Sequence, residues 1–171
     1  MIRRLGYIVL VVCFALISCS RGPSTDEEAI LELLDEGVRL AEEHSVKGLL
    51  KLTTTDFVVE PGGRDRDETK RIMMLAFLHY GDFKVLHPRP QIDLPSEEVE
   101  EASVRVPFLI VRKDQSLPDL KGLYENPKSW LQEVGEHADL YRVELRLIQQ
   151  NGDWLVRSAH LEGFTGLGFS D

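Results

Sequence analysis

The feature that most constrains the fold is a β-hairpin signal near the end of the chain, between Asp139 and Leu161. Apolar and charged residues alternate before the turn, which predicts a strand with one apolar and one charged face. Asn151-Gly152 follows, and both residues tolerate the positive φ angles of a two-residue hairpin turn. A second alternating segment begins at Trp154, which we expect on the apolar face. The two strands therefore predict one wall of a core or of a pocket.

A two-residue turn also fixes which residues pair across the hairpin. A regular ladder places His160 on the apolar face, but it also sets Arg146 opposite Arg157. Like charges directly across a sheet are destabilising. A β-bulge near Arg157 would relieve the repulsion, turn His160 outward and bring Ala159 and Leu161 inward. The sequence leaves both registers open.

The start of the chain has the pattern of a secretion signal. Met1-Ile-Arg-Arg is followed by an apolar run from Leu5 to Ile17. This run is shorter than the ~20 residues that a membrane-spanning helix needs, and its basic start is typical of a signal peptide. The run ends in Leu16-Ile17-Ser18-Cys19, which resembles the lipobox of bacterial lipoproteins. The resemblance implies removal of residues 1–18 and lipidation of Cys19; the alternative is an ordinary signal with an incidental cysteine.

Lipidation would account for both cysteines, because Cys13 leaves with the signal and Cys19 carries the lipid. No disulfide, thiolate nucleophile or cysteine metal site would then remain. Residues 19–25 form a short polar tether, and Ser20 resembles the residue that sorts lipoproteins to the outer membrane. We therefore expect a lipid-anchored envelope protein that faces the periplasm. Loss of the two signal arginines takes the formal charge from −9 to −11, which disfavours nucleic acid as a partner.

Residues 26–171 predict one α+β domain in which helices come before strands. Thr25-x-x-Glu28 has the pattern of a capping box at the start of the first helix. The apolar stripe of that helix comprises Ile30, Leu33, Leu34, Val38 and Ala41. A short helix capped by Ser45 follows, and then an extended segment from Thr53 to Val59.

A third helix is predicted between Asp65 and Gly81, and strands are predicted at residues 83–86, 91–94 and 103–111. The stripe of the third helix is expected to comprise Ile72, Leu75, Ala76 and His79, with the His79 ring partly buried. A helical insertion at about 113–138 then interrupts the strands. Its short apolar stripe includes Trp130, which we expect to cover the open end of the sheet as a lid or a plug.

The order of these elements resembles the nuclear transport factor 2-like superfamily, which includes SnoaL-like proteins and has a cystatin-like cone. The resemblance covers roughly Asp26 to Glu162 and depends on the Thr-Thr-Asp-Phe-Val-Val strand before Pro61-Gly-Gly and on the Asn151-Gly-Asp-Trp hairpin. It implies a curved antiparallel sheet that wraps the helices and leaves a pocket. The insertion at 113–138 departs from the family pattern. The family includes isomerases, dehydratases and non-catalytic binding modules, so the fold does not specify an activity.

The sequence contains no nucleophile elbow, phosphate loop, dinucleotide fingerprint or zinc-protease motif. Its five histidines lack metal-ligand spacing, so we expect neither a metal nor a cofactor. The best catalytic set comprises His160 as base, Asp139 as its orienting carboxylate and Tyr141 as donor. The alternative is a rim histidine and a tyrosine whose hydroxyl reaches water. Asp56 is expected to be a turn or cap residue.

The leading interpretation is a non-catalytic, membrane-tethered lipoprotein whose cone holds a small apolar ligand or a partner segment. The expected pocket-lining residues are Tyr141, Val143, Leu145, Trp154, Val156 and Trp130. One alternative is an isomerase- or dehydratase-like enzyme that uses His160 and Tyr141. Another is a structural dimer, although the charged outer face of the hairpin disfavours an extensive apolar interface. The sequence leaves the oligomeric state open.

Overall fold

The structure is a computed structural model that describes residues 25–94, 100–113, 138–164 and 169–170. Cys19, the tether and the predicted Trp130 helix lie outside these residues. The chain divides into two compact units, Met1–Glu32 and Leu33–Asp171. The described part of the first unit is the beginning of helix α2 (Asp26–Glu42), where the Glu28 N–H donates to Thr25 Oγ1 over 3.2 Å, as the capping pattern predicts.

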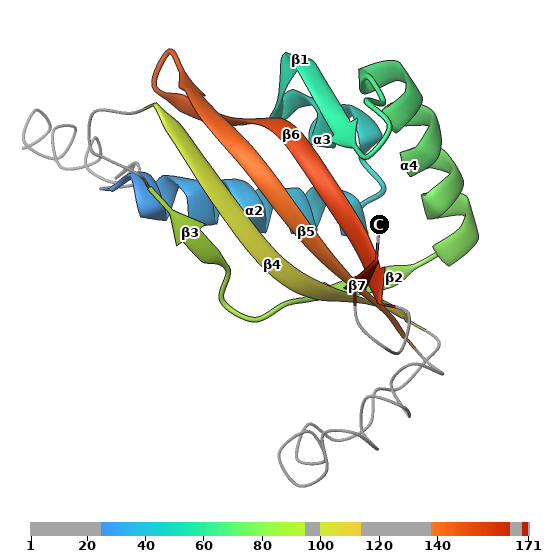
Figure 1. Ribbon diagram of the computed structural model, residues 1–171. Coiled ribbons are helices and arrows are strands. Elements are labelled where there is room, and N and C mark those ends of the chain that lie inside the picture. The colour runs from blue at the N-terminus through green and yellow to red at the C-terminus, as the bar shows by residue number, and fades with distance from the viewer. Residues whose placement is uncertain (1–24, 95–99, 114–137, 165–168, 171) are drawn as a thin grey trace, which may run out of the picture. The chain divides into compact units, whose positions relative to one another are not determined.

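The second unit contains the helices and the curved sheet that the sequence predicts (Figure 1). After α2 come α3 (Val46–Lys51), β1 (Thr53–Glu60), α4 (Arg66–Tyr80), β2 (Phe83–Leu86), β3 (Gln91–Asp93), β4 (Glu101–Arg112), β5 (Ala138–Gln150), β6 (Asp153–Phe164) and β7 (Phe169–Ser170). No helix in the described part of the chain is both long and apolar enough to span a membrane.

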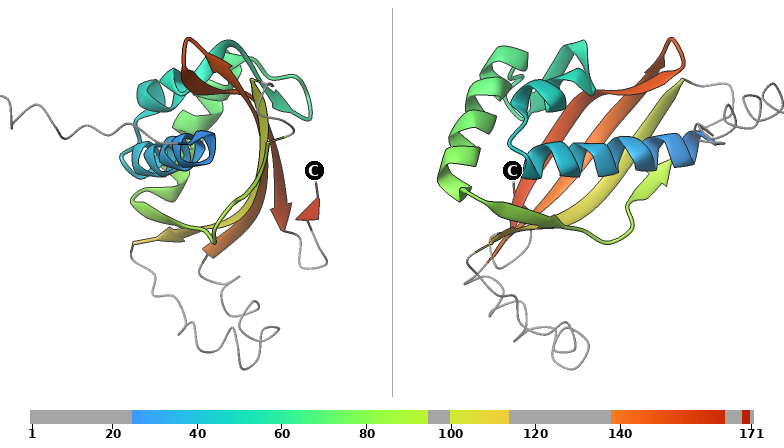
Figure 2. Two further views of the ribbon diagram at one scale, coloured as in Figure 1. Left: turned by 90° about the vertical axis from the view of Figure 1, so that its left-hand side faces the viewer. Right: turned by 180° about the vertical axis from the view of Figure 1, so that it is seen from behind.

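The sheet is mixed, with the strand order β1-β6-β5-β4-β2. β1 runs parallel to β6, and the other paired strands are antiparallel. β3 pairs with β4, and β7 pairs with β6. Figure 2 shows that the sheet is curved and that α3, α4 and the second half of α2 lie on its concave side.

The hairpin turn forms as predicted, with positive φ angles at Asn151 (55°) and Gly152 (89°). The first four pairs, from Gln150 with Asp153 to Leu147 with Val156, follow the regular ladder. Beyond them the register shifts, because Arg146 pairs with Ser158 and Arg157 becomes an extra residue.

Of the two registers that the sequence leaves open, the structure has the one with a bulge, and the regular pairing that the turn alone predicts is wrong beyond Leu147. In the regular ladder Leu145 would pair with Ser158 and Val143 with His160, but Leu145 pairs with Ala159 and Val143 with Leu161. The repulsion between Arg146 and Arg157 is thereby avoided, and His160 leaves the apolar face.

The predicted stripe of α4 is wrong at three of its four positions, since Ile72 is 46% exposed, Leu75 is 66% exposed and His79 is also exposed, while Ala76 is half-buried. The buried or half-buried side chains are Arg66, Thr69, Met73, Ala76, Phe77 and Tyr80. Two contacts at opposite ends of the helix set this rotation. The Arg66 guanidinium donates to the carbonyl oxygens of Leu50, Thr53 and Thr54, and the Phe77 ring stacks on His44 with centroids 4.9 Å apart.

The ends of α4 follow the predicted capping pattern. The Asp65 carboxylate accepts hydrogen bonds from the N–H groups of Asp67 and Glu68, each over 2.9 Å. Gly81 ends the helix with a φ angle of 60°. Ser45 stands at the N-cap of α3, but its side chain makes no capping hydrogen bond.

Candidate functional site

A cavity of about 380 Å³ lies on the concave side of the sheet, since residues of the helices and of the strands that they cover line it together. Its lining residues are Leu33, Leu34, Gly37, Val38, Ala41, Leu49, Leu50, Leu52, Thr53, Phe57, Thr69, Met73, Val85, His87, Pro90, Val106, Phe108, Val143, Leu145, Val156 and Ala159. The volume falls within the range of roughly 300–1,000 Å³ that is typical of small-molecule sites. Nearly all of these side chains are apolar.

The apolar lining follows from the local pattern of each element. The stripe of α2 faces the cavity with Leu33, Leu34 and Val38, as its helical period predicts. The bulge at Arg157 is equally important, because it places Ala159 in the lining where a regular ladder would place Ser158 and His160. One extra residue in β6 therefore keeps two polar side chains out of the cavity.

Three of the predicted lining residues, Val143, Leu145 and Val156, do line the cavity. Tyr141 and Trp154 share their face of the sheet but are not part of the lining. Trp154 is only 6% exposed and closes the apolar face near the turn. Leu161 has the inward parity that a bulge predicts, yet it is 42% exposed.

His160 lies on the convex face, where it pairs across the sheet with Glu144. Its Nε2 atom is 3.5 Å from the carboxylate of Glu162, which also accepts a hydrogen bond from Arg142 over 2.6 Å. Glu144 forms an ion pair with Arg105 over 3.2 Å. His160 is therefore part of a charged surface and does not reach the cavity.

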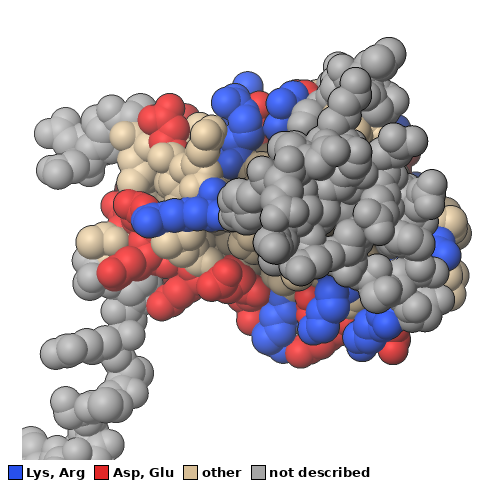
Figure 3. All heavy atoms as spheres, turned by 90° about the horizontal axis from the view of Figure 1, so that it is seen from below, with Lys and Arg blue, Asp and Glu red and all other residues tan. Residues whose placement is uncertain are grey.

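Asp56 lies inside β1, not at a turn or a cap as we expected. It is exposed, and its carboxylate is 3.6 Å from the guanidinium of the bulge residue Arg157. Basic and acidic side chains are also neighbours on the surface seen in Figure 3. Pairs of this kind are typical of a solvated surface rather than of a catalytic centre.

Asp139 and Tyr141 lie together at the end of β5, but their partner is Tyr80 of α4 and not His160. The hydroxyl oxygens of Tyr80 and Tyr141 are 2.8 Å apart. Burial raises the pKa of the Tyr80 hydroxyl well above its ordinary value, and hydrogen bonds with Tyr141 and Asp139 raise it further. The Tyr141 ring stacks on the cavity residue Phe108, with centroids 5.6 Å apart. The Tyr80–Tyr141 pair therefore lies at the edge of the cavity.

The described lining contains three side chains with polar atoms, Thr53, Thr69 and His87. Thr53 donates its hydroxyl to the Leu50 carbonyl over 2.9 Å, and His87 Nδ1 lies 2.8 Å from the Pro88 carbonyl oxygen. Thr69 is 9% exposed, and its hydroxyl has no hydrogen-bond partner among the described residues. No group of three histidine, cysteine or acidic side chains in the described ranges could hold a metal ion.

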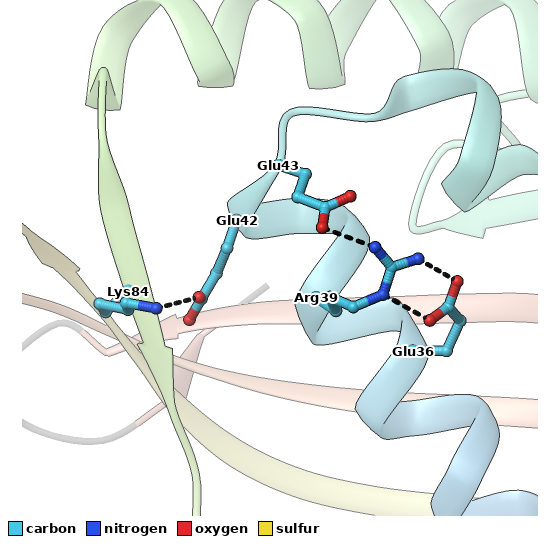
Figure 4. Close-up of polar contacts among 5 residues, drawn as sticks. All are labelled: Glu36, Arg39, Glu42, Glu43 and Lys84. Atoms are coloured by element: carbon cyan, nitrogen blue, oxygen red, sulfur yellow. Dashed lines mark hydrogen bonds and ion pairs between the residues drawn. The ribbon is translucent and has the colours of Figure 1, made fainter.

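The half-buried carboxylate of Glu42 holds the helix side of the site against the sheet edge (Figure 4). The Glu42 carboxylate accepts hydrogen bonds from Lys84 Nζ over 2.5 Å and from the Val85 N–H over 3.0 Å. Burial acts to raise the pKa of Glu42, but these bonds and the charges of Lys84 and Lys113 hold it below its ordinary value. Val85 lines the cavity, so Glu42 fixes part of its wall.

No family model matches the sequence, and no curated protein matches it either. Solved structures do match the fold. A nuclear transport factor 2-like protein of unknown function from Pseudomonas putida has a TM-score of 0.60 and 12% identity, over 82% of this chain and 88% of that one. A protein of unknown function with a cystatin-like fold from Nostoc punctiforme has a TM-score of 0.58 and 14% identity, over 82% and 92%.

A ketosteroid isomerase-like protein from Erwinia carotovora atroseptica also matches, with a TM-score of 0.57 and 13% identity over 83% of this chain and 98% of that one. At these identities the likeness shows the fold and not the activity. The helices followed by a curved mixed sheet, with a cavity on its concave side, agree with that fold. The chain therefore has the cystatin-like fold of nuclear transport factor 2-like proteins.

Proposed function

We propose that this chain is a binding module that holds a small apolar ligand in the concave-side cavity. The observation that supports the proposal is the cavity itself, about 380 Å³ in volume with an almost wholly apolar lining. A dry apolar cavity of roughly 150 Å³ is large enough to bind benzene. This cavity is more than twice that size, and each CH₂ group buried in it would contribute about 0.8 kcal/mol.

The same lining supports binding over catalysis. Acid/base catalysis needs a titratable group within hydrogen-bond reach of the reacting atoms. Among the described lining residues, His87 is the one ionisable side chain, and its Nδ1 atom lies 2.8 Å from the Pro88 carbonyl oxygen. A site with this composition favours retention of a ligand over its chemical conversion.

Gly37 offers a direct test, because it lines the cavity from within α2. A Cβ atom added there would lie 3.8 Å from Leu52 Cδ1, which is an ordinary contact. Gly37→Leu should therefore extend into the cavity and improve helix propensity at the same time. We expect the purified chain to bind 2-methylnaphthalene in equilibrium dialysis, and Gly37→Leu to weaken binding at least tenfold.

Asp35→Leu is the matched control, since it places the same new side chain on the exposed side of α2. It should leave the dissociation constant unchanged. Equal binding by wild type and Gly37→Leu would contradict the cavity as the ligand site. Undetectable binding by the wild type would contradict the proposed function.

We also propose that the module is tethered to the bacterial envelope membrane through a lipid on Cys19. The proposal is supported by the basic and apolar start of the chain and by the Leu16-Ile-Ser-Cys19 sequence. Cys19→Ala should abolish incorporation of a labelled fatty acid and leave the precursor unprocessed. Undiminished label on the variant would contradict the tether.

A second candidate function is enzymatic, and the cluster of Tyr80, Tyr141 and Asp139 favours it. A phenol that stays neutral can donate a hydrogen bond to a developing oxyanion, and a nearby carboxylate can accept a proton. An enzyme of this kind should exchange the α-protons of a bound cyclic ketone for deuterium, measured by NMR. Exchange by the wild type that is lost in both Tyr141→Phe and Asp139→Asn would support catalysis; no exchange above the buffer rate would exclude this reaction.

A further inference from the structure

We propose that the convex face of the sheet carries a second binding site, a polar groove around Arg146 that takes a small zwitterion with one carboxylate and one ammonium group. The groove has a volume of about 670 Å³ and lies on the side of the sheet opposite the apolar cavity. This site is separate from the proposed ligand cavity, so the assignment goes beyond the proposed function.

The floor of the groove is one row of residues that crosses five strands. In the register of the sheet, Ser103 of β4 and Ser158 of β6 flank Arg146 of β5 on its two sides. Asp93 of β3 and Val58 of β1 continue the row at its two ends, and all five residues line the groove. Directly paired residues point to the same face of a sheet, and Arg146 shares the parity of the other charged side chains of β5. The row therefore lies on the convex face.

The groove is hollow because of the size of these side chains. The two serines leave room on both sides of Arg146, and each of their hydroxyl groups can donate and accept a hydrogen bond. In the next row of the same face, the three central strands contribute Arg105, Glu144 and His160, which are all large. The hollow is therefore centred on the Arg146 row.

The protein compensates the two arginines of the groove differently. The guanidinium of the bulge residue Arg157 lies 3.6 Å from the Asp56 carboxylate and forms an ion pair with it. The Arg146 side chain is exposed and forms no ion pair within the described part of the chain. Arg146 is therefore the cation that an anionic group of a ligand can reach without displacing a protein carboxylate.

Three carboxylates of the groove are exposed too, and none of them forms an ion pair with another described residue. Asp93 and Glu101 lie together beside Ser103, on the side of β3 and β4, and Glu60 lies alone on β1. Two neighbouring carboxylates attract a cation more strongly than one does. We therefore assign the ammonium group to Asp93 and Glu101 and the carboxylate group to Arg146.

A ligand with a single charge fits this groove poorly. An anion meets the unpaired carboxylates and the net charge of −9 of the whole chain, and a cation meets Arg146 at the centre. A zwitterion compensates both. Neighbouring strands are about 4.8 Å apart and β3 lies two strands from β5, so the two charges of the ligand should be roughly 5–10 Å apart. An amino acid with its amine at the end of a chain meets this spacing better than an α-amino acid does.

The test uses three probes with the same alkyl chain: 6-aminohexanoate, hexanoate and hexylammonium. Each is titrated into the purified chain at low ionic strength, and NMR signals of Ser103, Arg146 and Ser158 give the dissociation constants for the groove. An exposed ion pair changes affinity by a factor of about five or less, so 6-aminohexanoate should bind roughly two- to fivefold more tightly than either single-charge probe. Signals of Val143 and Leu145 report separately on alkyl chains that enter the apolar cavity.

Arg146→Gln removes the charge and keeps a polar side chain, and it should lower the affinity for 6-aminohexanoate to that for hexylammonium. Asp93→Asn combined with Glu101→Gln should lower it to that for hexanoate. Arg105→Gln is the matched control, because it removes an exposed arginine of the same face that does not line the groove, and it should preserve the preference for the zwitterion. Circular dichroism of each variant verifies that it is folded.

The possible outcomes test each part of the assignment. Equal affinity of the wild type for the three probes, or tightest binding of a single-charge probe, would overturn the zwitterion as the ligand class. A preference that persists in Arg146→Gln or in the double carboxylate variant, or that is lost in Arg105→Gln, would overturn the assigned contacts. Absence of saturable shifts in the groove would overturn the site itself. Each of these results leaves the proposed function standing, because binding of 2-methylnaphthalene in the apolar cavity is measured independently.

Discussion

The concave and convex faces of β4, β5 and β6 are made by alternate residues of the same strands, yet charged side chains gather on the convex face and apolar ones on the concave face. On β5, Val143 and Leu145 line the cavity, whereas Arg142 and Glu144 form ion pairs on the opposite face. The concave side buries apolar surface, and the convex side keeps charges in solvent. The difference shows that the apolar cavity lies on one side of the sheet and the ion pairs of β5 lie on the other.

The bulge at Arg157 maintains this division along β6. Without the extra residue, the parity of the strand would reverse relative to β5, and His160 would enter the apolar side. With it, Ala159 lines the cavity and His160 joins Glu144 and Glu162. The register shift is therefore as important to the site as any residue of the lining.

Trp154→Ala should show the largest effect, because it removes a side chain that is 6% exposed from the apolar face. Truncation of a buried tryptophan to alanine costs about 3–5 kcal/mol. Urea denaturation followed by circular dichroism measures the loss in free energy of unfolding. A urea midpoint of unfolding close to that of the wild type would mean that Trp154 is exposed to solvent, and it would contradict the assignment of Trp154 to the apolar face.

Glu42→Gln tests the charge that fixes the helix side of the site. The Glu42 side chain is 19% exposed and its carboxylate accepts two hydrogen bonds, so the substitution should cost roughly 1.5–3 kcal/mol at neutral pH. Because the pKa of Glu42 is lowered in the folded protein, this contribution is present above the ordinary glutamate pKa of about 4.3. It is lost as the pH falls through the folded pKa.

Denaturation curves of wild type and Glu42→Gln between neutral and acidic pH measure this dependence. The difference in free energy of unfolding should narrow as the pH falls below about 4. A difference that is constant with pH would show that the charge of Glu42 does not stabilise the fold.

Much of the fold can be predicted from sequence because its determinants are local. The Asn151-Gly152 turn, the Asp65 cap and the α2 stripe depend on neighbouring residues, and each is confirmed. The register beyond Leu147 could not be predicted in this way. The alternation of apolar and polar residues is regular on both sides of a bulge, so the pattern alone does not show that an extra residue lies between them. The only indication of a bulge in the sequence was the repulsion expected between Arg146 and Arg157 in a regular ladder.

The errors and omissions arise from contacts between distant segments. The rotation of α4 depends on Arg66 reaching the carbonyl oxygens of β1 and on Phe77 stacking with His44. That rotation places Thr69 at the cavity and Tyr80 beside Tyr141, and so both were missed. A helical spacing of three and four residues, from Arg66 through Thr69, Met73 and Phe77 to Tyr80, was the one signal that pointed to this face.

Glu144→Ala should show the smallest effect. Both side chains of its ion pair with Arg105 are exposed to solvent, and such pairs contribute less than about 1 kcal/mol to the free energy of unfolding. The neighbouring Leu145→Ala faces the cavity and should cost about 2 kcal/mol or more. Equal losses in the free energy of unfolding for these two adjacent substitutions would contradict the division between the faces.

The most direct test of the central claim is methyl NMR of the chain titrated with 2-methylnaphthalene. Saturable shifts at a stoichiometry of one should appear for the methyl groups of the cavity, such as those of Val143, Leu145 and Ala159, and should be absent from Leu155 on the opposite face. The exposed side chains Leu75 and Leu78 of α4 serve as an internal control for adsorption to the surface. Shifts confined to those α4 residues, with the cavity methyl groups unchanged, would contradict the account.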